Sequence, residues 1–379
     1  MENQVTSPAP SLSDPHPPKR LALVSDLTGY GRCSLTVALP VISQLGVQCC
    51  PVPTAVFSNH TGYPTWHMTD FTPELTAYLD VWKALDFSFD GILTSFLGNQ
   101  SQAGLIRQFL TDFKKENTLY ILDPAMGDNG KAYATCGEEI QESMRSLAAL
   151  ADVVTPNLTE ACILTNTPWR PDFSRNELIT LAQRLLSMGP RQVVITGIPC
   201  KSFIGNLCMT DIEPLSENIS ISEDRHIPSE NQTAFLRTRK VARPRHGTGD
   251  IFSAILASEL LKGNTITGTS LKGASQSGVL SEESSLTGKP LKAPSSLTGA
   301  PFPSQEALTA AVKKASGFVR KCLLVSDACS LPETECVCFE KILYQLKKIT
   351  TVFHLYHEYL QKDITICKSR LLRAFSTFT

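Results

Sequence analysis

A chain of 379 residues, of which 42% are hydrophobic, is long enough to bury a large core as one α/β domain or as two smaller ones. Its 35 Lys and Arg residues are balanced by 36 Asp and Glu residues, which leaves a formal charge of −1. This balance excludes the broad basic field that nucleic-acid binding requires, so a small molecule is the expected ligand.

The first nineteen residues are rich in Pro and Ser and lack the apolar segment of a signal peptide. They are predicted to form a disordered tail. No apolar run reaches the roughly 20 residues that a membrane span needs. We therefore expect a soluble, cytoplasmic protein with no membrane partner.

From residue 20 onward, short aliphatic or β-branched runs alternate with stretches of helical periodicity. The first predicted strand ends in the glycine-rich turn TGYGRCS. The predicted strand segments are 21–26, 49–58, 89–98, 118–128, the start of 151–164, and 191–197. The alternation predicts βαβ units, and so an α/β fold with a central, mostly parallel sheet. Ligands of such sheets bind at the carboxyl ends of the strands.

Residues 264–303 differ from the rest because they are rich in Ser, Thr, Gly and Pro and contain the sequence SSLTG twice. This composition predicts a flexible insertion after a helix that ends near Gly263. Residues 347–379 are predicted to be a basic C-terminal extension. One domain, 20–346, is thus expected to be interrupted by the insertion.

The clearest local motif is Gly247-Thr248-Gly249-Asp250, which directly precedes an amphipathic run. A helix that begins there would present unpaired N–H groups and its positive dipole end to an anion. Asp250 would lie in the first turn, where its carboxylate can accept a proton from an attacking hydroxyl. The alternative is an ordinary Asp-capped helix after a glycine turn.

Two further loops carry acidic side chains at predicted strand ends. DPAMGD contains Asp123 and Asp128, and TPNLTE contains Thr155, Asn157 and Glu160. Such oxygen donors suit Mg²⁺, which bridges nucleotide phosphates. The alternatives are that Asp123 caps a turn and that Asn157 and Glu160 form a helix-capping pair.

The twelve cysteines are scattered, and neither the pair Cys49-Cys50 nor the segment Cys336-Val337-Cys338 has the spacing of a zinc or redox motif. They are predicted to be small buried hydrophobic residues in a reducing compartment.

The order of DPAMGD, TPNLTE and GTGD resembles the ribokinase-like kinases, and within them the branch that phosphorylates vitamin B6 and the thiamin pyrimidine. The segment FSNHTGY (57–63) is similar to the substrate-pocket segment of pyridoxal kinases, and DLTGYGRCSLTVALP (26–40) resembles a bacterial pyridoxamine-kinase-like subgroup. The resemblance covers about residues 20–263 and 304–346. It implies a three-layer αβα sandwich and a homodimer.

The resemblance also implies roles for the motif residues. Asp250 would be the base on the substrate 5′-hydroxymethyl group, and the N–H groups of residues 247–249 would hold the charge on the γ-phosphoryl group. Mg²⁺ and ATP would be required, and a monovalent cation stays an open question. The implied ATP site comprises Thr155, Asn157, Thr196 and the three residues Gly247, Thr248 and Gly249, and the implied Mg²⁺ site comprises Asp123, Asp128 and Glu160.

The implied substrate site contains His60 and Thr61 beside the pyridine ring and Ser25 near the ring nitrogen or phenol. The loop after the first strand is one residue shorter than in typical pyridoxal kinases, so Asp26 is an alternative to Ser25. Phe96 stands where those enzymes often have tyrosine, which would keep ring stacking and lose a phenolic hydrogen bond. For His60 the alternative is a core histidine.

The predicted activity is ATP-dependent phosphorylation of pyridoxal, pyridoxine or pyridoxamine to the 5′-phosphate. A hydroxymethylpyrimidine kinase is the nearest alternative, although those enzymes commonly have cysteine at the position of Asp250. A sugar or nucleoside kinase lacks support because the expected Gly-Gly motif near the start is missing. A ligand-binding protein that has lost catalysis is the alternative from another class.

Overall fold

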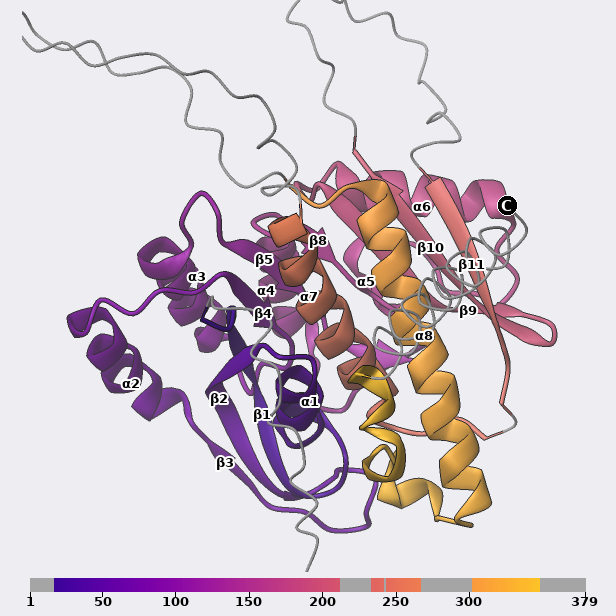
Figure 1. Cartoon of the computed structure of the whole chain (residues 1–379), viewed down its shortest axis with the longest axis horizontal. Helices are drawn as coiled ribbons and strands as arrows, with labels where there is room; N and C mark the ends of the chain where they lie inside the picture. Colours follow the sequence, from indigo (N-terminus) through magenta and orange to yellow (C-terminus); the bar gives the residue numbers. More distant parts are fainter. Residues whose placement is uncertain (1–16, 212–232, 242, 267–301, 348–379) are drawn as a thin grey trace, which may run out of the picture.

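The fold is an alternation of strands and helices, seen in a computed structural model that describes residues 17–211, 233–241, 243–266 and 302–347 (Figure 1). Residues 1–16 of the predicted tail, 267–301 of the predicted insertion and 348–379 of the C-terminal extension lie outside these ranges, so the predictions for these segments stay untested. None of the helices in the described ranges has the length and apolarity needed to cross a bilayer.

The main sheet has nine strands in the order β11-β10-β9-β8-β5-β4-β1-β2-β3. Its strands are β1 (Arg20–Tyr30), β2 (Gln48–Asn59), β3 (Met68–Asp70), β4 (Gly91–Thr94), β5 (Leu119–Leu122), β8 (Val153–Val154), β9 (Gln192–Cys200), β10 (Phe203–Thr210) and β11 (Thr233–Arg239). The pairings from β2 through β1, β4, β5 and β8 to β9 are parallel, whereas β3, β10 and β11 pair antiparallel at the two edges. A separate hairpin joins β6 (Gly127–Asp128) to β7 (Lys131–Ala132).

Helices cover both faces of this sheet (Figure 1). They are α1 (Ser34–Gln44), α2 (Thr72–Ala84), α3 (Ser101–Phe113), α4 (Glu138–Ala148), α5 (Leu158–Leu164), α6 (Arg175–Leu186), α7 (Thr248–Ile266) and α8 (Gln305–Ala328), with 3₁₀ turns η2 (Glu333–Glu335) and η3 (Glu340–Ile342). One buried cluster joins the sheet to α2 through α6, and the other joins it to α1, α7 and α8.

The alternation of side chains along β1 shows why the sheet needs two helical layers. Leu21 and Leu23 belong to the cluster with α1, α7 and α8, while Ala22 and Val24 belong to the opposite cluster. Successive strand residues point to opposite faces, so a continuous apolar run is buried only when both faces are covered. The predicted three-layer αβα sandwich with a mostly parallel sheet is confirmed.

Some boundaries differ from those expected from sequence. β1 continues into the predicted glycine turn as far as Tyr30, because its backbone stays paired with β2 up to Asn59. The helix α7 reaches Ile266, three residues into the segment predicted as an insertion. The described chain resumes at Phe302, whose ring lies 3.9 Å from the Arg191 guanidinium. These differences arise from tertiary pairing that local composition does not encode.

Candidate active site

The GTGD motif forms a tight loop at the start of α7. Gly247 has φ +83°, and a Cβ at this position would lie 1.9 Å from the carbonyl oxygen of Arg32. Both constraints demand glycine. The helix begins at Thr248, and the Ile251 N–H donates to the Gly247 carbonyl at 3.2 Å. The first N–H groups of such a helix have no intrahelical acceptor, so this turn has the geometry in which N–H groups can bind an anion.

A buried arginine, two residues before Gly247, binds the segment that follows α8. The fully buried Arg245 side chain donates to the carbonyl oxygens of Pro332 at 2.9 Å and Leu331 at 2.8 Å, and lies 3.3 Å from Asp327. One residue further, the His246 carbonyl accepts from the Val337 N–H at 3.1 Å. Sequence reasoning missed Arg245, because its partners lie more than eighty residues away.

Asp250, in the first turn of α7, shares a small cavity with Ser25, Asp123 and Ser253. The cavity holds about 10 Å³, which is room for about one water molecule and far too little for a pyridine ring. Ser25 is 2% exposed. The structure thus places Ser25 in the wall of this small cavity rather than on an open surface where a ring could bind.

Burial makes Asp250 a weak acid. Burial, with a smaller contribution from the negative charges of Asp123 and Asp26, raises its pKa to about 7 against the opposing hydrogen bond from the Ser34 N–H. Asp26 is itself 5% exposed, and its pKa is raised by burial against the hydrogen bonds from Ser34 and Thr28. A carboxyl with a pKa near neutral pH suits a general base.

The other acidic residues extend this electrostatic pattern. Burial raises the pKa of Asp123 to about 6, although the Ser253 hydroxyl donates to its Oδ2 at 2.7 Å. Burial and the charge of Asp123 raise the pKa of Glu160 well above its usual range. Buried carboxylates that repel one another are relieved by a divalent cation, so Asp123 and Glu160 fit a Mg²⁺ site. Asp128 is exposed and accepts from the Asn129 N–H at 2.8 Å.

The loop before α5 has a structural role as well. The Asn157 side chain accepts from the Glu160 N–H at 3.0 Å, and the Asn157 N–H donates to Glu160 Oε2 at 2.8 Å. This reciprocal pair is a capping box, so the helix-capping interpretation is confirmed. The Asn157 amide also donates to the Gly127 carbonyl at 2.7 Å. An isolated parallel bridge sets Asn157 beside Thr196, and Thr155 is buried at the preceding strand end.

The predicted substrate segment lies beside the anion loop at His60. The half-buried His60 ring lies 4.5 Å from the His246 ring, next to the anion loop, and burial together with His246 lowers the pKa of His60 to about 4. Thr61 is exposed. The Phe96 ring packs edge-on against the Phe57 ring, with 5.8 Å between the ring centroids. The structure therefore places His60 against His246, the residue that precedes the anion loop.

Tyr133 lies near the acidic residues and was missed by sequence reasoning. Although the residue is 41% exposed, partial burial of its phenol raises its pKa, and the charges of Glu160, Asp128, Asp250 and Asp123 raise the pKa further. It lies in the loop after the β6–β7 hairpin, where no local motif marks it. A separate depression of about 420 Å³ lies under Trp169 and beside α5, and none of the predicted site residues lines it.

Comparison with known proteins bears on these features. The profile of a family described as phosphomethylpyrimidine kinase matches residues 37–276, more than half of the chain. The chain belongs to this family. The matched range contains the three motifs DPAMGD, TPNLTE and GTGD, from Asp123 to Asp250.

Other relatives of this phosphomethylpyrimidine kinase family member carry the name pyridoxal kinase. It is 30% identical to pyridoxal kinase of Ovis aries over 236 residues, covering 60% of this chain and 72% of the relative. It is 27% identical to pyridoxal kinase PdxY of Pseudomonas aeruginosa over 259 residues, covering 66% and 83%. A Bacteroides thetaiotaomicron structure, named for phosphomethylpyrimidine kinase and solved with pyridoxal, superimposes with a TM-score of 0.68 at 28% identity, covering 86% and 95%. The predicted kinship with ribokinase-like B6 kinases is confirmed.

Proposed function

We propose that this protein transfers the γ-phosphoryl group of ATP to the 5′-hydroxymethyl group of a B6 vitamer. The observation that carries the proposal is the position of Asp250, in the first turn of α7 beside a glycine-shaped anion loop, with a pKa near 7. The pyridoxal kinase names of its relatives, and the pyridoxal of the Bacteroides structure, support the choice of substrate.

In this mechanism Asp250 accepts the hydroxyl proton as the oxygen attacks the phosphoryl group. The N–H groups of residues 247–249 hold the charge that develops on the phosphoryl oxygens. Mg²⁺, held directly or through water by Asp123 and Glu160, would neutralise phosphate charge. Positioning and charge stabilisation account for the catalysis, since no covalent intermediate with the protein is needed.

The vitamer would lie on the solvent side of Asp250, because the cavity beneath that residue is too small for it. We infer that the pyridine ring stacks on Phe96. Ser25, which is buried and lines the cavity with Asp123 and Asp250, would act on the substrate only indirectly, through these two carboxylates. Thr155 and Thr196 would border the nucleotide, and Asp128 would act on Mg²⁺ through water.

ADP release from purified protein with Mg²⁺-ATP tests the proposal, with pyridoxal, pyridoxine, pyridoxamine and hydroxymethylpyrimidine offered separately. Turnover with a vitamer should fall about 10²–10⁴-fold in Asp250→Asn. The exposed substitution Asp80→Asn on α2 is the matched control. Turnover only with the pyrimidine would move the activity to thiamin metabolism, and binding of pyridoxal without any turnover would favour a protein that has lost catalysis.

We also infer from the family resemblance that the protein is a cytoplasmic homodimer. Analytical ultracentrifugation at micromolar concentration should give twice the 41.4 kDa chain mass. Assays with K⁺ replaced by a bulky organic cation would show whether a monovalent cation contributes.

A further inference from the structure

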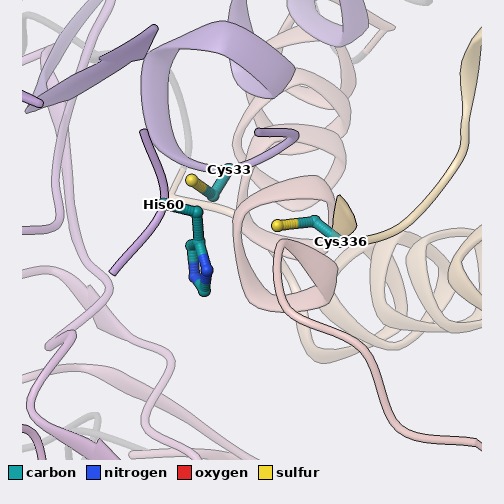
Figure 2. Close-up of side chains that lie close together, drawn as sticks. All are labelled: Cys33, His60 and Cys336. Atoms are coloured by element: carbon teal, nitrogen blue, oxygen red, sulfur yellow. The ribbon is translucent and has the colours of Figure 1, made fainter. Parts of the chain in front are cut away.

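Two cysteines and a histidine from three distant segments meet beside the anion loop (Figure 2). One ligand atom each of Cys33, His60 and Cys336 lies within 4.8 Å of the other two. Cys33 precedes α1, His60 follows β2, and Cys336 follows η2 near the end of the described chain. Among the described residues, this is the one group of three such side chains with mutual distances this short.

The environment of the two thiols differs from that of ordinary core cysteines. Cys33 is 7% exposed and is the N-cap residue of α1, yet its side chain makes no capping hydrogen bond. Cys336 is 0% exposed and has φ +61°, a conformation that is strained for a residue with a Cβ. In Figure 2 the sulfur of Cys336 points from its own segment toward the other two residues. Strain of this kind persists only where the surrounding structure fixes the residue.

Two thiols and an imidazole are the donor set of zinc sites in proteins. Zn–S bonds of about 2.3 Å in a tetrahedron set the two sulfurs about 3.8 Å apart. The three atoms, now within 4.8 Å of one another, would have to approach by about 1 Å at most. Rotation of side chains accomplishes such a change. The exposed His246 ring lies 4.5 Å from the His60 ring at an angle of 42°, so His60 has a solvent-facing side where a metal ion can arrive and a fourth ligand can bind.

We propose that Cys33, His60 and Cys336 form a binding site for Zn²⁺, distinct from the oxygen-rich site of Asp123 and Glu160. Binding would release two protons, one from each thiol, and form two Zn–S bonds and one Zn–N bond. The Cys336 thiol would give up its weak contact of 3.8 Å with the Thr334 carbonyl. The fourth position would hold water or another small ligand.

The imidazole must also change partner. His60 Nδ1 now accepts from the Gly62 N–H at 3.0 Å. Coordination through either ring nitrogen ends that arrangement, since the neutral ring has a single lone pair available. Gly62 is exposed, so its N–H can donate to water instead. The release of the Gly62 N–H is a specific structural consequence of zinc binding.

The bound ion would connect three segments that already touch the anion loop. Arg32, next to Cys33, contributes the carbonyl oxygen that restricts position 247, and Val337, next to Cys336, donates its N–H to His246. Zinc would thus restrain the loop that precedes Asp250. The proposal concerns a site made by the fold, and it does not depend on the substrate of the enzyme.

Competition against a chromophoric zinc chelator tests the site in the full-length protein, reduced with a phosphine and held in excess Mg²⁺ so that the oxygen-rich site is occupied. We expect one Zn²⁺ per chain, and a raised melting temperature when zinc is added. Cys33→Ala and Cys336→Ala should each weaken binding by more than 100-fold. Cys329→Ala, at the end of α8, should bind as the wild type does. Cobalt in place of zinc should give a thiolate charge-transfer band in the wild type, and Cys33→Ala and Cys336→Ala should both lose this band.

X-ray absorption spectroscopy of the wild-type zinc complex keeps the test independent of whether the variants fold. Two sulfur and two nitrogen or oxygen neighbours are expected around the ion. A shell without sulfur, binding unchanged in Cys336→Ala, or no zinc retained against the chelator would each overturn the proposal. Loss of kinase activity alone would not affect it, since binding and coordination are measured directly.

Discussion

Asp250→Asn should make the protein less active and more stable. The folded carboxyl has a pKa of about 7, against 3.8 for the ordinary group. The folded state therefore keeps a proton that the unfolded state loses between pH 4 and pH 7. Under this condition the free energy of unfolding falls as pH rises through that window. Asparagine has the same shape, can still accept from the Ser34 N–H, and carries no charge to bury.

The size of the effect follows from these two pKa values. At 1.36 kcal/mol for each pH unit between them, the raised pKa lowers stability by up to about 4 kcal/mol at pH 8, where the folded carboxyl is ionised, and by about 1.5 kcal/mol at pH 5, where it must hold a proton. Structural relaxation and water would reduce both values, so about 2 kcal/mol at pH 8 is a reasonable expectation.

Urea unfolding of both proteins at pH 5, 6, 7 and 8, without Mg²⁺ or nucleotide, measures this difference. The stabilisation by Asp250→Asn should grow with pH, whereas Asp80→Asn, on the exposed face of α2, should give no such growth. Burial of an uncompensated charge at Asp250 is thus expected to destabilise the fold. This expectation would be refuted if Asp250→Asn were less stable than the wild type at pH 8, or if the two proteins differed in stability by the same amount at pH 5 and pH 8.

Other predictions concern the anion loop and the base. The kcat/KM of the wild type should rise with pH and level off above an acid limb at or below pH 7, because Asp250 must be ionised and bound Mg²⁺ lowers its pKa. Gly247→Ala should reduce kcat/KM by at least 100-fold, since its Cβ would collide with the Arg32 carbonyl, while Gly249→Ala, whose Cβ meets nothing within 4 Å, should change it far less; equal losses in the two variants would be contrary evidence. Arg245→Met should lower the free energy of unfolding, measured from the urea midpoint, by about 3–5 kcal/mol, because the buried groups that Arg245 binds lose their donor. The substitution Arg243→Met, at an exposed position, should leave the midpoint unchanged. An unchanged midpoint for Arg245→Met would contradict this role.

The sequence alone determined the fold class and the motifs that carry the chemistry. Apolar runs that alternate with helical stretches require a sheet covered on both faces, as Leu23 and Val24 illustrate by entering opposite clusters. Gly247 and Asp250 are three residues apart in the chain, so their placement at one helix start follows from local rules. The capping pair Asn157 and Glu160 is local in the same sense.

Tertiary structure decided the features whose partners are remote in sequence. Arg245 binds carbonyl groups more than eighty residues away, and Cys33 meets Cys336 across most of the chain. The contact between the His60 and His246 rings likewise joins residues that are far apart in the chain. Spacing rules for metal ligands and substrate segments apply only when the ligands are close along the chain, because only then does backbone geometry limit their distance. Where three separate segments converge, packing of the whole domain sets that distance.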